Sequence, residues 1–125
     1  MENLKIERTK STPEINFDLG TGNLSIKGES FPENAAKFYT PILNWIKEYF
    51  KRTTTEMVLE FEIVYFNSST SKIFMTLFDL LDHEVQNGKK VAVNWKCDKE
   101  NETAIECGEE FKEDIERLPF NIIQL

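Results

Sequence analysis

The amino-acid sequence predicts a single α/β domain with a mixed β-sheet, in which an N-terminal hairpin precedes alternating helices and strands. Three observations point to this fold class. Two-residue apolar alternation, typical of strands, takes turns along the chain with the three- and four-residue spacing of amphipathic helices. The 125 residues have a hydrophobic share of 40%, which suits one domain with its own core. No linker, repeat or low-complexity segment divides residues 1–125.

The charge balance excludes several classes of partner. Lys and Arg number 15 against 22 Asp and Glu, a net charge of -7, so we expect no nucleic acid and no anionic membrane as a partner. Cys97 and Cys107 form no disulfide framework, and no Cys or His stands near them at zinc-ligand spacing, so we expect no metal or cofactor. The absence of a leader and of an apolar run that could span a bilayer predicts a soluble, cytoplasmic protein.

The first quarter of the chain predicts strands. Leu4 and Ile6 alternate with polar residues in a short strand candidate. Residues 15–19 and 24–26 alternate in the same way on either side of the Gly20–Asn23 loop, which is the pattern of a β-hairpin.

A first helix follows this hairpin. Residues 30–33 have the form of a capping box, with Ser30 as N-cap and Glu33 at the third helical position. Apolar residues then recur at helical spacing as far as Phe50. Pro41 interrupts the pattern, so the helix either bends there or gives way to a second helix that Thr40 caps.

The rest of the chain alternates strand and helix. Strands are expected at residues 56–66, 91–95 and 120–125, because apolar β-branched and aromatic residues gather there. A second amphipathic helix fills the first interval and closes on Asn87–Gly88, and a third helix spans roughly residues 101–117. This alternation predicts parallel strand pairs joined by right-handed crossovers.

Few residues suggest catalysis. His83 is the only histidine, and as a general base it would act with Asp79 or Glu84, but no nucleophile or metal pattern accompanies it. The sequence therefore predicts a solvated histidine and a chain that is not an enzyme. The many acidic residues of the third helix are typical of a solvated face.

The segment Asn67–Lys72 is the strongest candidate site. Four consecutive hydroxyl residues stand where a parallel strand ends and a helix begins, and sites in open α/β sheets lie outside such strand ends. One interpretation is structural: Ser68 or Ser69 caps the helix and the others fill the turn. The other is a phosphorylation switch, since a helix N-terminus tolerates an anion. The two interpretations are compatible.

The sequence resembles the SiaC family of bacterial regulatory phosphoproteins. The segments that carry the resemblance are residues 11–15, 30–34, 64–75, 78–81 and 109–114, so the resemblance runs nearly end to end. SiaC proteins in turn resemble STAS domains, the fold of anti-sigma factor antagonists. The STAS antagonists have an Asp before the acceptor hydroxyl and a Gly two residues after it, where this chain has Asn67 and Thr70. These differences favour the SiaC branch.

The resemblance implies a non-enzymatic adaptor in cyclic-di-GMP signalling and biofilm regulation. Its partners would be a serine/threonine kinase, a PP2C-type phosphatase and an effector, a diguanylate cyclase that the unmodified form activates. The family's acceptor position matches Ser68, with Ser69 and Thr70 as alternatives. The neighbouring residues would contact the partner: Asn67, Ser69, Thr70, Ser71 and Lys72.

Three rival functions differ from this one. A STAS-like domain that senses a small nucleotide or lipid would need a pocket at the same strand end. An enzyme would depend on His83. A purely structural interaction domain would use the hydroxyl run only to cap a helix.

Overall fold

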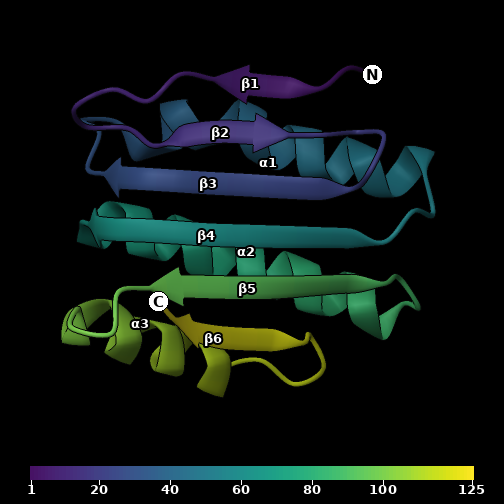
Figure 1. Cartoon of the computed structure of the whole chain (residues 1–125). Coiled ribbons are helices and arrows are strands. Elements are labelled where there is room, and N and C mark those ends of the chain that lie inside the picture. The colour runs from purple at the N-terminus through teal and green to yellow at the C-terminus, as the bar shows by residue number, and fades with distance from the viewer.

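The computed structural model describes all 125 residues and contains one six-stranded sheet (Figure 1). Its strands are β1 (Leu4–Ile6), β2 (Glu14–Phe17), β3 (Asn23–Ser30), β4 (Met57–Phe66), β5 (Val91–Cys97) and β6 (Phe120–Gln124). They lie side by side in chain order. β1, β2 and β3 pair antiparallel, whereas β3, β4, β5 and β6 pair parallel. The predicted α/β class, with a mixed sheet and an N-terminal hairpin, is confirmed.

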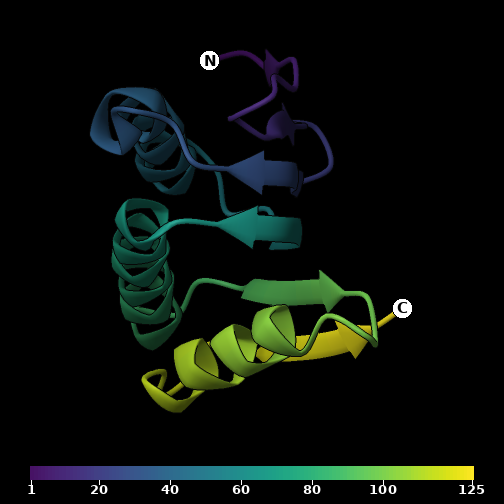
Figure 2. The same ribbon diagram turned by 90° about the vertical axis from the view of Figure 1, so that its left-hand side faces the viewer.

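Three helices connect the parallel strands: α1 (Ala35–Arg52), α2 (Ser68–Gln86) and α3 (Glu102–Glu113). Each crossover carries the chain one strand further in the same direction, so a shared handedness brings the helices to one face of the sheet. Figure 2 shows α1 and α2 side by side on that face, with α3 running obliquely below them. No helix covers the opposite face of the sheet.

Aromatic rings fill the space between the sheet and its helices. Phe61 on β4 and Phe74 and Phe78 on α2 pack around Trp95 on β5, which is 1% exposed. The Trp95 indole N–H donates to the Ala104 carbonyl of α3 at 2.9 Å.

Gly108 brings α3 close to this core. A Cβ atom at Gly108 would lie 2.6 Å from Trp95 Cδ1, so only a residue without a side chain permits this approach. The helix therefore rests directly on the indole ring, and its own aromatic residue Phe111 reaches Trp95 at a ring-centroid distance of 5.4 Å.

The start of α1 differs from the sequence prediction. Asn34 is the N-cap, and its Oδ1 atom accepts the Lys37 backbone N–H at 3.0 Å. Ser30, predicted as the cap, is the last residue of β3 and pairs with Phe66 in the parallel ladder. Thr40 caps nothing, because α1 continues through Pro41 as one helix. Pro41 cannot donate to the carbonyl four residues earlier, but it lies on the exposed face, where water replaces the lost donor.

The third helix is shorter than predicted, ending at Glu113 rather than near residue 117. The cause is Asp82 on α2, a buried carboxylate that accepts the backbone N–H groups of Arg117 and Leu118 at 2.8 Å and of Glu116 at 3.2 Å. These N–H groups therefore bind a side chain instead of extending the helix. At the end of α2, Gly88 has a φ of 93°, which confirms the predicted left-handed cap.

None of the three helices is both long enough and apolar enough to cross a bilayer.

Candidate phosphoacceptor site at the start of α2

The junction between β4 and α2 is built around Asn67. Its backbone is extended and its Oδ1 atom accepts the Thr70 backbone N–H at 3.0 Å, so Asn67 is the N-cap of α2. The prediction that Ser68 or Ser69 caps the helix is therefore wrong by one or two positions. Ser68 is the first helical residue, and its hydroxyl is left without a capping role.

Thr70 points into the core, unlike its neighbours. It is 0% exposed, and its Oγ1 atom donates to the Ser30 carbonyl at 3.1 Å. The Asn67 backbone N–H donates to the same carbonyl, also at 3.1 Å. One carbonyl at the end of β3 thus holds both the cap and the first turn of α2. This burial removes Thr70 from the accessible hydroxyls and from any surface that a partner contacts.

A chain of three buried hydroxyls lies beneath this first turn. Ser30 Oγ is 2.7 Å from the Tyr39 hydroxyl and 2.9 Å from Thr70 Oγ1. Because the Thr70 proton is directed to the Ser30 carbonyl, Ser30 donates to Thr70 and Tyr39 donates to Ser30. Every proton of this hydroxyl chain then has an acceptor. Burial raises the pKa of Tyr39 to about 12, although the hydrogen bond with Ser30 acts in the opposite direction.

The accessible part of the site consists of Ser68 and Ser69. Both side chains are exposed, Ser71 is half-buried, and Lys72 is exposed without an ion-pair partner. The first backbone N–H groups of a helix lack intrahelical acceptors, and the helix dipole places partial positive charge there. A negative group on Ser68 would therefore meet a favourable local field.

Exposed apolar side chains adjoin this site. Phe31, just after β3, is 36% exposed, and Val64 and Tyr65 at the end of β4 are 60% and 53% exposed. The rings of Phe31 and Tyr65 meet edge to face at a centroid distance of 5.8 Å. We call these three residues the apolar rim. Phe31 and Tyr65 lie together because the parallel strands β3 and β4 end at the same edge of the sheet, and Val64 directly precedes Tyr65 on β4.

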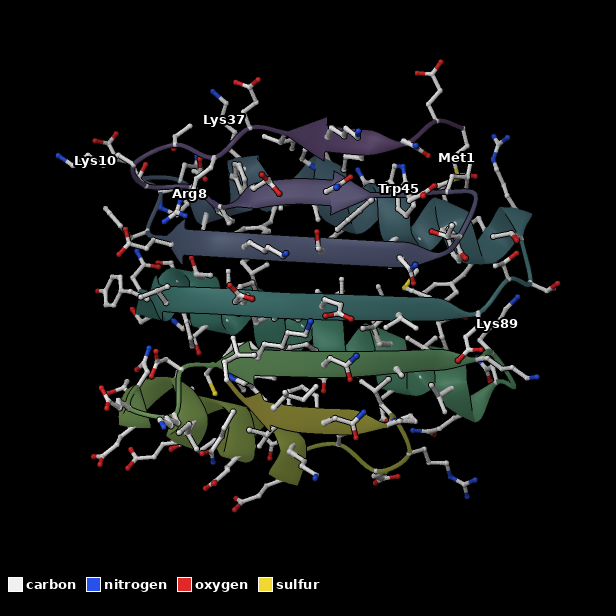
Figure 3. The ribbon with its side chains drawn as sticks, in the orientation of Figure 1. Met1, Arg8, Lys10, Lys37, Trp45 and Lys89 are labelled. Atoms are coloured by element: carbon white, nitrogen blue, oxygen red, sulfur yellow. The ribbon has the colours of Figure 1, made fainter.

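Basic side chains lie farther along that edge. Figure 3 shows Arg8 and Lys10 in the loop between β1 and β2, together with Lys37 near the start of α1, at the end of the sheet where β3 finishes. The loop is joined to the apolar rim, because the Phe31 backbone N–H donates to the Ser11 carbonyl at 2.8 Å.

Asn101 fixes the other side of the strand end. Its Nδ2 atom donates to the Val64 carbonyl at 3.1 Å, and its Oδ1 atom accepts the Ala104 backbone N–H at 3.2 Å as the N-cap of α3. The end of β4 is therefore tied to β3 through Ser30 and to α3 through Asn101. This arrangement holds Ser68 on a rigid support.

The alternative catalytic residues are not brought together. His83 is exposed, and its Nε2 atom lies 3.2 Å from Asn87 Nδ2, with no carboxylate bound to the ring. Asp82, beside it, is buried. Burial acts to raise the pKa of Asp82, but the backbone N–H groups of residues 116–118 outweigh it, so the pKa lies below its ordinary value. Asp82 has a structural role that sequence reasoning missed. No group of three His, Cys, Asp or Glu side chains is arranged for a metal ion.

The cavities of the molecule lie away from the hydroxyl run. The most voluminous, about 490 Å³, lies on the sheet face that no helix covers and is lined mainly by polar residues of β1, β2 and β3. The five best-formed cavities include no residue of the segment 67–72 in their linings. None of these five cavities therefore provides the pocket that a nucleotide- or lipid-sensing domain would need at the start of α2.

Comparisons with known proteins agree with the sequence resemblance. The model of the family described as SiaC family regulatory phosphoprotein matches residues 6–125. An uncharacterized protein of Pseudomonas aeruginosa strain UCBPP-PA14 is 35% identical over 122 residues, which are 98% of this chain and 96% of that protein. The crystal structure of apo-SiaC from Pseudomonas aeruginosa has 34% identity and a TM-score of 0.92, covering 98% of this chain and 99% of that one. SiaC in complex with the diguanylate cyclase SiaD, whose activator it is, has 34% identity and a TM-score of 0.93, with the same coverage.

Proposed function

The chain belongs to the SiaC family of regulatory phosphoproteins, and on that basis we propose that it is a non-catalytic adaptor switched by reversible phosphorylation of Ser68. The observation that carries the proposal is the exposed Ser68 hydroxyl in the first turn of α2, directly after the Asn67 cap. The helix start accommodates a phosphate, while the surrounding apolar rim offers a surface whose binding a phosphate would disturb.

The proposed partners are three proteins of the cytoplasm. A serine/threonine kinase adds the phosphate and a PP2C-type phosphatase removes it. The effector is a diguanylate cyclase, which the unmodified chain binds and activates, so the output is a change in cyclic-di-GMP signalling. The complex of the related SiaC with the cyclase SiaD supports this choice of effector.

The switch works through charge and desolvation. In the unmodified state Ser68, Ser69 and Lys72 form the polar part of the docking surface, and the apolar rim forms the rest. Phosphorylation adds about 1.5 to 2 negative charges at the centre of this surface. Burying such a group in an interface without a cation beside it costs several kcal/mol, which is enough to abolish a complex of ordinary affinity.

The support beneath Ser68 makes a rearrangement of the fold unnecessary. Thr70, Ser30 and Tyr39 hold the first turn of α2 against β3, and the phosphate would extend from the opposite side of that turn into solvent. The modified and unmodified chains therefore share one fold and differ in one surface.

Intact mass measurement and peptide mapping of the chain from its native cell, with and without phosphatase treatment, test the acceptor. We expect a phosphate on Ser68. Affinity measurements with the cyclase then test the switch: Ser68→Asp should weaken binding at least tenfold, and Ser68→Ala should preserve it.

Thr21→Asp provides a matched control. Thr21 is exposed in the turn between β2 and β3, and its Oγ1 atom accepts the Asn23 backbone N–H at 3.2 Å, a bond that a carboxylate can also make. This variant carries the same added charge near the start of β3, at the end of the sheet opposite the start of α2, and should bind the cyclase normally. Absence of the phosphate in every growth condition, together with undiminished binding of Ser68→Asp, would refute the proposal.

A further inference from the structure

A small notch separates α2 from α3. Its volume is about 140 Å³, and the residues that line it are Met75, Phe78, Asp79, Phe111, Asp114 and Ile115. In Figure 2, α3 is inclined to α2, and the lining residues of the notch come from these two helices and the segment just after α3. We call this feature the α2–α3 notch.

The floor of the notch is apolar and rigid. Phe78 is 2% exposed and Phe111 is 7% exposed, and their ring centroids lie 5.2 Å apart. Met75 lines one side of the notch and is 45% exposed. A thioether adapts its shape to whatever it contacts, so this side can close over an inserted group.

Two carboxylates without a cation stand at the mouth of the notch. Asp79 and Asp114 are exposed, and the ion pairs of the chain are formed elsewhere, by Arg52 with Glu48 and by Lys96 with Glu60. Four exposed glutamates elsewhere on α3 add to the negative charge of this helix: Glu106, Glu109, Glu110 and Glu113. Apolar floor and acidic mouth together match a side chain with an apolar stem and a cationic head.

The size of the notch restricts its occupant. Pockets for drug-sized ligands and cofactors hold about 300–1,000 Å³, whereas this notch holds about 140 Å³, close to one large side chain. Among cationic side chains, the planar guanidinium of arginine can serve two carboxylates at once and also packs on aromatic faces. We propose that the α2–α3 notch receives an arginine side chain from a basic, apolar segment of the effector.

This inference rests on the proposed function, because it names the part of the effector that docks beside the switch. Ser68, Met75 and Asp79 are separated by seven and then four residues, so they share one stripe of α2. At 1.5 Å per residue, Met75 lies about 10 Å from Ser68 along the helix axis. A partner segment anchored in the notch would therefore extend over Ser68.

The notch can be tested apart from the switch with a defined probe. The probe is the blocked peptide Ac-Ala-Leu-Arg-Leu-Ala-NH2, and its control replaces arginine with citrulline, which has nearly the same shape without the charge. The whole chain, labelled at its Met and Ile methyl groups, is titrated with each peptide by NMR. We expect saturable shifts at Met75 and Ile115 with the arginine peptide and about tenfold weaker binding with the citrulline peptide.

Variants of the chain make the test specific. Asp79→Asn with Asp114→Asn should weaken the arginine peptide about tenfold and abolish the preference over citrulline. Glu7→Gln with Glu14→Gln removes the same charge from exposed positions near β1 and β2 and should leave binding within twofold. Three results would overturn the inference. The two peptides bind equally, the shifts are confined to other residues, or no saturable shift occurs at a peptide concentration of roughly 10 mM, ten times a Kd of 1 mM.

The outcomes for the notch and for the switch are separable. If the arginine peptide does not bind in the notch while Ser68→Asp still weakens cyclase binding, only the notch assignment fails. If the peptide binds as expected but Ser68→Asp leaves cyclase binding intact, the notch is an arginine site and the proposed switch fails.

Discussion

Replacing Ser30 with alanine should destabilise the chain more than removing the neighbouring Tyr39 hydroxyl. The Ser30 hydroxyl is the middle member of the hydroxyl chain, because it accepts from Tyr39 and donates to Thr70. Without it, the buried Tyr39 O–H has no acceptor and Thr70 Oγ1 loses its donor. Tyr39→Phe, in contrast, removes a donor and leaves every remaining O–H group with an acceptor.

The magnitude follows from the number of groups left unpaired. A buried donor without an acceptor costs about 1–3 kcal/mol, and the loss of a typical hydrogen bond costs about 0.5–1.5 kcal/mol. Ser30→Ala therefore costs about 2–4 kcal/mol in free energy of unfolding. Tyr39→Phe costs about 0.5–1.5 kcal/mol, since it loses one hydrogen bond only. The larger loss is a substantial part of the roughly 5–15 kcal/mol that stabilises a domain.

Urea unfolding followed by circular dichroism measures both losses. With an m value of about 1–3 kcal/mol/M, Ser30→Ala should lower the unfolding midpoint by roughly 1–2 M without changing m. Ser25→Ala is the control, because the same substitution on the same strand then falls on the sheet face that no helix covers. Amide hydrogen exchange should speed up at residues 68–71 in Ser30→Ala alone. A midpoint shift for Tyr39→Phe as large as that for Ser30→Ala would refute the reasoning.

Three further predictions concern the buried residues Tyr39, Asp82 and Gly108. Because the folded pKa of Tyr39 is raised to about 12, its contribution is complete below pH 10 and falls by about 3 kcal/mol as pH rises from 10 to 12. Unfolding measured across this range should show a larger loss in the wild type than in Tyr39→Phe, where the raised pKa of Tyr49 still contributes. The pKa of Asp82 is lowered, so its effect on stability has the opposite pH dependence. The stability that the ionised carboxylate contributes is present above the ordinary Asp pKa and is lost as pH falls below about 4. Asp82→Asn should therefore be less stable than the wild type at pH 7, and its stability should change less on acidification. Gly108→Ala places a Cβ against Trp95 and should cost about 1–3 kcal/mol, with a changed tryptophan emission spectrum; an unchanged spectrum and midpoint would contradict the contact.

The alternation of strands and helices along the chain, and with it the parallel pairing of the later strands, was predictable from the sequence. Residues 57–66 alternate so that Met57, Leu59, Phe61 and Ile63 face the helices, and the structure buries all four. The intervening helices then require parallel pairing of β4 with its neighbours, because a helical crossover returns the chain to the same end of the sheet. Local pattern sufficed here because strand and helix each bury one face.

The N-cap of α1 was predicted wrongly because the side chain of Ser30 forms its hydrogen bonds with residues that are distant in the sequence. Ser30 and Glu33 match a capping box, but pairing with β4 keeps the backbone at Ser30 extended, and the hydroxyl is taken by Tyr39 and Thr70. The cap then falls to Asn34. No short-range pattern distinguishes these two uses of a serine.

Two buried polar residues of α2 could have been found by the same periodicity that identified the core. Thr70 precedes Phe74 by four residues, and Asp82 follows Phe78 by four, so both share the buried face of the helix. The polar side chains of Thr70 and Asp82 suggested exposure, whereas their positions on the helix indicated burial. Both are buried, because each side chain has hydrogen-bond partners in the protein interior. The exposure of Ser68 follows from its position on the opposite side of that helix.

The shared Ser30 carbonyl has a consequence for how the proposed acceptor, Ser68, would be recognised. It binds Asn67 and Thr70 across gaps of 37 and 40 residues, so the helical turn that displays Ser68 depends on the assembled sheet. In an unfolded or truncated chain the Ser68 hydroxyl lies on a disordered segment, which lacks the free backbone N–H groups of a helix N-terminus. A kinase that requires this helical turn would phosphorylate only folded chains, and phosphorylation of Ser68 would then report that the chain has folded.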